Sequence, residues 1–335
     1  TPGPYRSYQA AGAWIVLAVM PIWTARGYLR GVLREVVHGE SEETAENEAI
    51  SYRAAAAGIL LGVGALTLIL VYTSMSLWVV LLFLAIFFLY TMAIVRIRAQ
   101  IGPPSHDAEF MGPDRMLLAA FGPSRLGANN VAMFSRLAWM GRSYRPHPAG
   151  HQLEAFKLAQ VVGSRSRYFF VALIVASVIG VISSFWAVLH HTYRFGQNNM
   201  FISMGGEGFR YMSAYLQNPR NHDVTMLYDV GIGAVVTGGL AVLHHQFIWF
   251  PFHPVGYAVA CGWVMSAAWF SVFLAWIAKA LILRFGGIRL YRDMVPFFFG
   301  GILSQFIIGG LWAIIGEIRG EHFYVFFPYL TNWGR

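Results

Sequence analysis

The 335-residue chain contains one cysteine, Cys261, and very few charged side chains. One cysteine excludes a disulfide within the chain and any metal site built from several cysteines. Because Cys261 lies in an apolar run, we interpret it as a small buried core residue rather than a reactive thiol. Charged residues make up only 12% of the chain, against roughly 25% in soluble domains. This scarcity of charge argues against a soluble globular protein.

Three motifs that would identify a nucleotide-dependent or hydrolytic protein are also missing. The chain has no Walker A sequence, so an ATP-driven pump subunit is disfavoured. It has no dinucleotide-binding fingerprint after a strand and no G-x-S-x-G nucleophile motif. The net charge of +8 does not indicate nucleic-acid binding, because basic residues of membrane proteins collect in their cytoplasmic loops. We therefore predict no cofactor, no nucleic-acid partner and no enzymatic activity.

What the sequence does have is a series of apolar runs, each close to the length of about 20 residues that a helix needs to cross a bilayer. We predict an all-α fold, a polytopic transmembrane helix bundle that forms one domain over residues 1–335 and has the lipid bilayer as its partner. About seven spans are expected, at residues 10–25, 54–74, 76–95, 168–190, 227–249, 261–283 and 294–316. The first of them is short and is interrupted by Pro21.

The distribution of arginine predicts the orientation of these spans. The segment 96–167 carries nine arginines and one lysine, the segment 25–53 carries four arginines, and the segment 191–226 carries three. Since cytoplasmic loops are enriched in basic residues, we predict that 25–53 and 96–167 are cytoplasmic loops at the bacterial inner membrane and that 191–226 is an outer loop. The turn 284–293 carries three arginines although this count places it outside, so residues 249–262 are a candidate re-entrant or broken helix.

Two of the long loops are predicted to contain amphipathic helices at the membrane interface. Residues 148–160 begin with a proline in the first turn, which suits the start of a helix. The partly apolar face of this helix consists of Leu153, Phe156, Leu158 and Val161. Residues 208–217 in the outer loop show a weaker form of the same pattern.

Charged residues inside the spans are the strongest pointers to function, because a charge within lipid is costly. Asp229 opens the fifth span, Lys279 lies near the end of the sixth and Asp293 opens the seventh. On this count all three lie at the outer membrane level, where Lys279 can pair with either aspartate. The alternative is that each side chain simply extends to the interface. Further polar candidates for a transport path are Gln246, Ser304 and Gln305.

Histidines raise a second hypothesis, a metal site. His147 and His151 are spaced i, i+4 and Glu154 follows three residues later, a spacing that can place metal ligands on one helical face. An interfacial helix is the better interpretation, because no HExxH sequence is present and His147 precedes the proline that starts the helix. The pairs His190–His191 and His244–His245 end antiparallel spans at opposite faces, so one site is not expected to use both.

The stretches ISYRAAAAGILLG, VRIRAQIGPP, HPAGHQLEAFKLAQ and WIAKALILRFGGIRLYRDMVPFFFGGIL are spread over most of the chain. Together they resemble the C-terminal half of a large bacterial membrane-protein family that is known only as domains of unknown function. The resemblance runs from about residue 10 to about residue 316 and brings no established activity. Because members of that family are usually about twice as long, it implies that an N-terminal half or other membrane subunits complete the protein.

A fainter similarity is confined to the tail, where a tryptophan-rich span leads through a lysine and a Gly-Gly turn to a span opened by proline. The residues are Trp263, Trp269, Trp276, Lys279, Gly286, Gly287 and Pro296. This order is similar to that of the last spans of oligopeptide transporters. A likeness at the level of the fold does not define a function by itself.

The sequence therefore predicts a secondary transporter, or the C-terminal half of one, coupled to protons or sodium because no nucleotide site is visible. The alternative is a non-catalytic structural subunit of a larger membrane complex, and a third hypothesis is a membrane-embedded metal enzyme. A transporter requires polar groups that converge on a cavity within the membrane. A structural subunit requires apolar, well-packed helix interfaces, and a metal enzyme requires histidines that meet at an ion.

Overall fold

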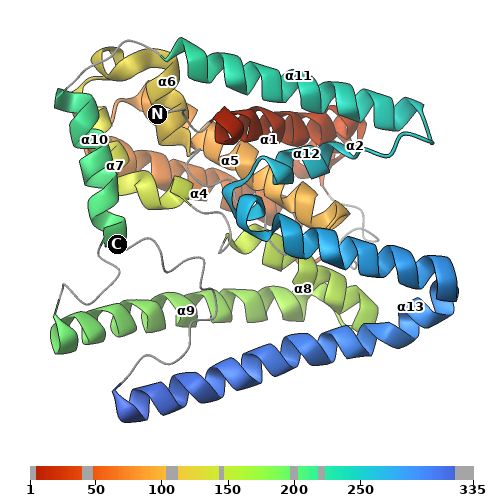
Figure 1. Cartoon of the computed structure of the whole chain (residues 1–335). Coiled ribbons are helices and arrows are strands. Elements are labelled where there is room, and N and C mark those ends of the chain that lie inside the picture. Colours follow the sequence, from red (N-terminus) through yellow and green to blue (C-terminus); the bar gives the residue numbers. More distant parts are fainter. Residues whose placement is uncertain are drawn as a thin grey trace. The chain divides into compact units, whose positions relative to one another are not determined.

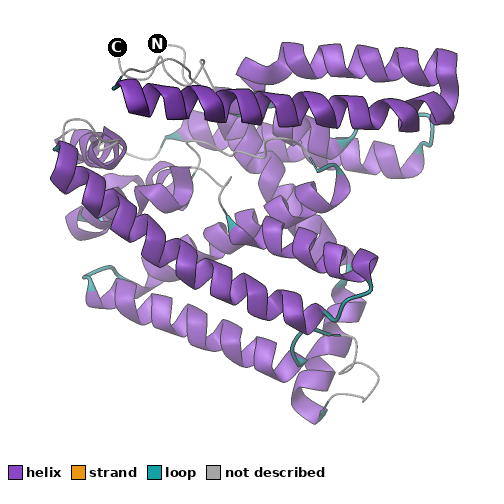
Figure 2. Ribbon diagram, turned by 90° about the horizontal axis from the view of Figure 1, so that it is seen from below, coloured by secondary structure: helices purple, strands orange, loops and turns teal. Residues whose placement is uncertain are grey.

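The computed structural model describes residues 5–39, 48–102, 112–142, 147–196, 203–217 and 223–320. Every regular element in this part of the chain is a helix, with no strand, so the predicted all-α class is confirmed (Figure 2). In chain order the helices are α1 (Tyr5–Thr24), α2 (Arg26–His38), α4 (Tyr52–Tyr72), α5 (Leu77–Gln100), α6 (Pro113–Leu126), α7 (Ala128–Arg142), α8 (Pro148–Val162), α9 (Ser166–Phe195), α10 (Ser203–Gln217), α11 (Val224–Gln246), α12 (Pro254–Ala260) and α13 (Trp263–Arg319) (Figure 1). The chain divides into two compact units, Thr1–Trp263 and Val264–Arg335, and each is described by itself.

Side-chain caps explain where two of the apolar helices begin. The Ser51 hydroxyl accepts a hydrogen bond of 3.2 Å from the Ala54 amide at the start of α4. The Asp223 carboxylate accepts one of 3.1 Å from the Met226 amide at the start of α11. Both caps satisfy amides that have no partner in the first helical turn. As a result, α4 and α11 begin two to three residues before the spans that hydropathy alone predicts.

Five helices are long and apolar enough to cross a membrane. Four of them, α4, α5, α9 and α11, occupy the second to fifth predicted spans. The remaining candidate, Ala268–Gly316, is 49 residues long. At 1.5 Å per residue this corresponds to about 74 Å of helix, more than twice the roughly 30 Å hydrocarbon layer. A single crossing therefore does not account for α13.

α13 is broken in its middle at Gly287, whose φ of 64° and ψ of −166° are not helical. Such a positive φ favours glycine, which has no Cβ to clash with the backbone. The two arms fold back beside each other (Figure 1). They cover the sixth and seventh predicted spans, and the break falls within the arginine-containing turn between them.

The first predicted span, residues 10–25, differs most from the structure. α1 extends from Tyr5 to Thr24 and then bends by 65° into α2. α1 meets the length and hydropathy requirements only together with α2, so the bent pair counts as a sixth span only if it crosses as one unit. The proline-rich segment 249–262 contains the short helix α12, which packs against α1 and α11.

In the first unit, α5 is the helix that joins two buried clusters. Its C-terminal half, which contains Tyr90 and Ile94, packs with α1, α11 and α12. Its N-terminal half, which contains Val79 and Phe83, packs with α6, α7 and α10. In this unit, each element that carries a candidate site therefore packs against α5 or against a helix that packs against α5.

The closest helix pair of the unit is α1 with α11. A Cβ atom on Gly12 would overlap the carbonyl oxygen of Val230, and one on Gly233 would overlap the carbonyl oxygen of Gln9. Only residues without a side chain permit backbones to approach this closely. The order of these contacts also shows that the two helices run antiparallel.

Candidate functional site

Helices α6 and α7 form a hairpin that runs along α5. At the N-terminal end of α5, the Trp78 ring meets Phe121 of α6 edge to face at 5.3 Å. Asn130, near the start of α7, accepts a 2.8 Å hydrogen bond from the Ser76 amide that precedes α5. The Asn130 amide donates to the Ser76 hydroxyl and to a carbonyl of α6 at 3.0 and 2.7 Å, so this buried side chain is well satisfied. The tip of the hairpin is thereby fixed beside the α4–α5 turn.

The open end of the hairpin lies further along α5. There Asp114 is only 5% exposed and interacts electrostatically with Tyr90. Gly112 and Gly141, at the two ends of the hairpin, are so close that a Cβ on Gly112 would lie 2.7 Å from the Gly141 Cα atom. The chain then returns to α5, where His147 contacts Thr91.

These contacts define a segment that folds back on itself beside a membrane-spanning helix. α6 has 14 residues and α7 has 15, so each is about 21–23 Å long and too short to cross a hydrocarbon layer of roughly 30 Å. The backbone is interrupted at Gly122 (φ 73°, ψ 155°), and a second glycine with positive φ, Gly127, joins the helices. The segment 96–167, predicted as a cytoplasmic loop, thus contains a hairpin that follows α5 from Tyr90 to Ser76.

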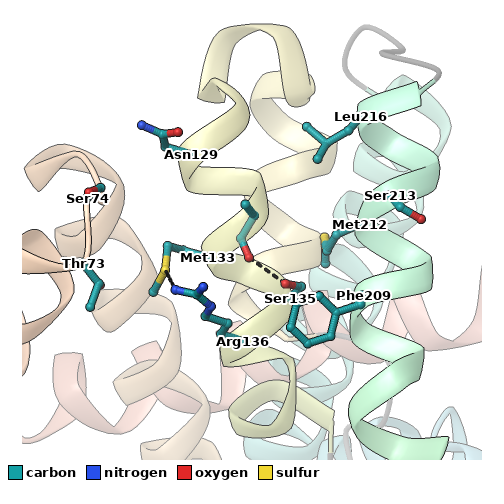
Figure 3. Close-up of a pocket in the computed structure, with 11 residues that line it drawn as sticks. Thr73, Ser74, Asn129, Met133, Ser135, Arg136, Phe209, Met212, Ser213 and Leu216 are labelled. Carbon is teal, nitrogen blue, oxygen red and sulfur yellow. Dashed lines mark hydrogen bonds between the residues drawn. The ribbon is translucent and has the colours of Figure 1, made fainter.

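A pocket of about 310 Å³ opens at the hairpin tip (Figure 3). The α4–α5 turn, α7 and α10 line it with Thr73, Ser74, Asn129, Ala132, Met133, Ser135, Arg136, Phe209, Met212, Ser213 and Leu216. Ser74 adopts a φ of 72°, which is unusual for a residue other than glycine. Arg136 donates a hydrogen bond of 3.5 Å to the Met133 sulfur, a weak acceptor. No carboxylate of a described residue lies within 4.0 Å of the Arg136 guanidinium.

Asp229, the first of the predicted path residues, is buried in α11 with 8% of its surface exposed. Among the described residues, nothing donates a hydrogen bond to its Oδ2 atom. It lies next to Val230, which touches Gly12 at the α1–α11 crossing. The same group of helices holds a partly buried polar contact, in which the Tyr257 hydroxyl donates to Gln9 Oε1 at 3.0 Å.

The other predicted path residues are divided between the two units, with Gln246 in the first and Lys279, Asp293, Ser304 and Gln305 in the second. Gln246 ends α11 with its side chain exposed, and Ser304 and Gln305 are exposed on the second arm of α13. Lys279 lies 5.5 Å above the Tyr291 ring, so it joins the two arms of α13 through a cation–π contact. It is not within 4.0 Å of the Asp293 carboxylate in the described second unit. Neither of the two path residues of the first unit, Asp229 and Gln246, lines the pocket in Figure 3.

Two of the three predicted metal ligands, His147 and Glu154, connect α8 to α5. His147 caps α8, since its Nδ1 atom accepts from the Ala149 amide at 3.3 Å while Nε2 lies 3.1 Å from the Thr91 hydroxyl. Glu154 forms an ion pair with Arg98 of α5. His151 Nδ1 is 3.7 Å from Glu154. Within the part of the chain that is described, no group of three His, Cys, Asp or Glu side chains is arranged to hold a metal ion.

Burial shifts the acid–base properties of two groups outside the spans. Removal from water raises the pKa of the Asp114 carboxyl from 3.8 to about 6, an effect that the nearby Arg115 partly opposes. Burial also lowers the pKa of the His147 imidazole below its ordinary value. Asp114 therefore titrates close to physiological pH, whereas His147 stays neutral there and keeps its cap.

Sequence reasoning missed the hairpin and Asp114. The available signal was local: Gly112-Pro113 immediately before Asp114 marks a helix start, and Gly122-Pro123 with Gly127 marks two breaks. The predicted interfacial helix at 148–160 corresponds to α8, although Leu158 and Val161 of its apolar face are exposed. The predicted helix at 208–217 lies within α10, which packs against α7.

Comparison with known proteins adds one finding. A family model matches residues 1–328, nearly the whole chain. The chain belongs to the DUF6785 family. DUF6785 is described as a family of unknown function, so the predicted membership of an uncharacterised family is confirmed while the match brings no activity. No curated protein and no solved structure matches the chain.

Proposed function

We propose that this DUF6785 protein is a secondary transporter, or part of one, in which Asp229 binds the coupling proton or sodium ion. The observation that carries the proposal is the burial of this carboxylate in a membrane-spanning helix with one oxygen lacking a hydrogen-bond donor among the described residues. An ionisable side chain inside a membrane marks a functional site by default, because its charge is costly there unless it binds a counter-charge.

The surroundings of Asp229 support reversible ion binding. The glycines at the α1–α11 crossing keep the two backbones in contact, so a small relative movement of these helices changes access to the carboxylate. Gln9 and Tyr257 supply further polar atoms in the same helix group.

The α6–α7 hairpin supports transport rather than a purely structural role. Broken helices that line a cavity are a recurrent feature of secondary transporters, because their free backbone groups bind solutes. Here α7 lines the pocket of Figure 3, and the interruptions at Gly122 and Gly127 lie in the part of the hairpin that precedes α7. We assign this pocket as the first place to search for substrate contacts, with small peptides as the first class to screen because of the similarity in the tail.

The experiment is a proteoliposome assay with a trapped pH indicator and a library of di- and tripeptides. A transported peptide should acidify or alkalinise the lumen in wild-type protein, and Asp229→Asn should abolish this coupled proton movement. Asp223→Asn is the matched control, since it makes the same change on the same helix where an asparagine oxygen can still cap the first turn. The proposal fails if Asp229→Asn moves protons and peptide as the wild type does.

Ion binding can be measured without knowing the substrate. Infrared difference spectra between two pH values should contain the band of a protonated carboxylic acid that disappears in Asp229→Asn. For sodium, the same variant should lose the sodium-induced change in tryptophan fluorescence. If neither signal depends on Asp229, coupling at this residue is excluded.

A structural subunit is the second candidate, and one observation favours it. None of the apolar window of α9, Ser166–Arg194, is buried inside the described chain. Such a helix requires lipid or partner helices around it. A photo-crosslinking residue in place of Ile182, on the exposed side of α9, should react with lipid if the protein acts alone and with a discrete subunit if it belongs to a larger complex.

The orientation in the bacterial inner membrane is part of the proposal. Val162 at the end of α8 and Tyr193 near the end of α9 are both exposed and lie at opposite ends of the same predicted span. In a Cys261→Ser background, Val162→Cys should react with an impermeant maleimide only from the cytoplasmic side and Tyr193→Cys only from the outside. The reverse result would invert the orientation predicted from arginine counts.

A further inference from the structure

Helix α2 has one arginine face and one apolar face. Arg26, Arg30 and Arg34 are four residues apart, so they lie within an arc of about 80° on a helix that turns about 100° per residue. Tyr28, Leu29 and Leu33 lie at about 200°, 300° and 340° from Arg26 around the same helix, so the apolar arc adjoins the arginine arc and Leu33 lies at its edge, about 20° from Arg26. The pattern is typical of a helix that lies in the plane of a membrane surface.

The apolar face has no protein over it in the described chain. α2 contains no buried residue, and the side chains of Tyr28 and Leu33 are 63% and 64% exposed. All three arginines are exposed as well. An amphipathic helix whose apolar side chains are not covered by protein needs another apolar phase to stabilise it.

Contacts with α4 fix the level at which α2 lies. The Tyr28 hydroxyl is 3.1 Å from the Tyr52 hydroxyl. The Arg53 guanidinium donates to the carbonyl oxygens of Val36 and Val37, at 3.0 and 3.2 Å, and so caps the last turn of α2. Tyr28 and Val37 are nine residues apart, about 13 Å along the helix, yet both are held by the first turn of α4. α2 therefore crosses the end of a membrane-spanning helix instead of following it into the membrane.

The bend and the aromatic residue before α2 agree with this placement. The 65° angle between α1 and α2 turns the chain away from the direction of α1 where α1 ends. Arg26 stacks 4.7 Å above the ring of Trp23, the exposed last-turn residue of α1. Tryptophan prefers the level of the lipid headgroups, so the start of α2 lies at that level.

We propose that α2 is an interfacial helix that binds the phosphate groups of anionic phospholipids through Arg26, Arg30 and Arg34 while Tyr28, Leu29 and Leu33 enter the acyl-chain boundary. Guanidinium groups suit this partner because they bind phosphate oxygens in a bidentate way. The proposal does not depend on transport activity.

The test uses the full chain with Cys261→Ser and one spin label, in nanodiscs of phosphatidylcholine with or without phosphatidylglycerol. Leu33→Cys reports the apolar face, and Gly31→Cys, where a side chain meets no other atom within 4 Å, reports the polar face. We expect oxygen to reach the Leu33→Cys label and a water-soluble nickel chelate to reach the Gly31→Cys label. Phosphatidylglycerol should move the Leu33→Cys label deeper.

Replacement of the three arginines by glutamine should remove the response to phosphatidylglycerol, with about a fivefold weaker lipid preference for each arginine lost. Arg165→Gln with Arg167→Gln, on α9, is the control for net charge and should leave the response intact. The proposal is overturned if nickel reaches both labels, which means a helix in water. It is also overturned if nickel reaches neither, which means a broken span, or if the glutamine variant responds as before.

Discussion

Replacing Asp114 by asparagine should remove a pH-dependent loss of stability. The carboxyl has a pKa of about 6 in the folded protein, above the 3.8 of an exposed aspartate, because burial disfavours its charged form. The folded state therefore binds the proton more tightly than the unfolded state. The resulting stabilisation is fully present below about pH 3.8 and is lost as the pH rises through about 6.

The size of the effect follows from the same shift. Each tenfold change in proton affinity corresponds to about 1.4 kcal/mol, so the rise from 3.8 to about 6 is worth about 3 kcal/mol. Asp114→Asn is always neutral and should avoid this loss. The variant should match the wild type near pH 4 and exceed its unfolding free energy by up to about 3 kcal/mol at pH 8.

The assay is reversible unfolding by steric trapping in bicelles between pH 4 and 8, with the difference between variant and wild type plotted against pH. Other carboxyls titrate in this range, but their contributions cancel in the difference. Asp223→Asn is the control, because Asp223 is an exposed cap on α11. A difference that stays flat from pH 4 to 8, or one that favours the wild type at high pH, would refute the assignment of a buried, proton-binding Asp114.

Three further substitutions test packing by the same unfolding measurement. Gly233→Ala should lower the free energy of unfolding by about 1–3 kcal/mol, because its Cβ atom overlaps the α1 backbone. Gly238→Ala, on the same helix, meets no atom within 4 Å and should be neutral or stabilising. Equal effects of the two substitutions would contradict the close crossing of α1 and α11. Asn130→Ala should lower the free energy of unfolding by about 2–3 kcal/mol, because it leaves the Ser76 amide without its acceptor. Replacing the neighbouring pocket residue, Asn129→Ala, should lower it far less. Gly287→Ala should cost about 1–3 kcal/mol through backbone strain alone, since its surroundings are open; an unchanged variant would mean that the break of α13 is not needed.

Hydropathy located the long apolar helices well because each is a continuous apolar run whose length matches the bilayer. α4, α5, α9 and α11 are of this kind. A cap such as Ser51 starts a helix two residues before its predicted span, and α5 and α9 continue five residues beyond their predicted ends at 95 and 190. The break of α13 was also visible in the sequence, since Gly286-Gly287 interrupts a stretch far longer than one crossing. In each case one physical effect, the transfer of apolar side chains from water into lipid, decides the outcome.

The hairpin escaped prediction because no single sequence pattern identifies it. Its helices are short and carry Asp114, Arg125 and Arg136, so their composition is that of a polar loop. They are held along α5 by specific contacts between distant residues, such as Asn130 with the backbone before α5, and a linear pattern does not reveal such contacts. Asp229 was recognised from the sequence as a charge within a span. Its burial where α1 crosses α11 depends on α1, which lies more than 200 residues earlier in the sequence.

The two buried carboxylates, Asp114 and Asp229, are connected through packed structure although they lie on different helices. α6, which carries Asp114, accepts a hydrogen bond of 2.9 Å at the Ala119 carbonyl from the amide that precedes α11. Tyr90 of α5 interacts with Asp114 and packs edge to face against Trp14 of α1 at 6.2 Å. α1 in turn crosses α11 beside Asp229. The hairpin therefore contacts α11 directly and α1 through Tyr90, and closely packed interiors have little free volume in which to absorb the movement of one element. This arrangement gives the hairpin tip, where the pocket lies, a physical route to the site at which the ion is proposed to bind.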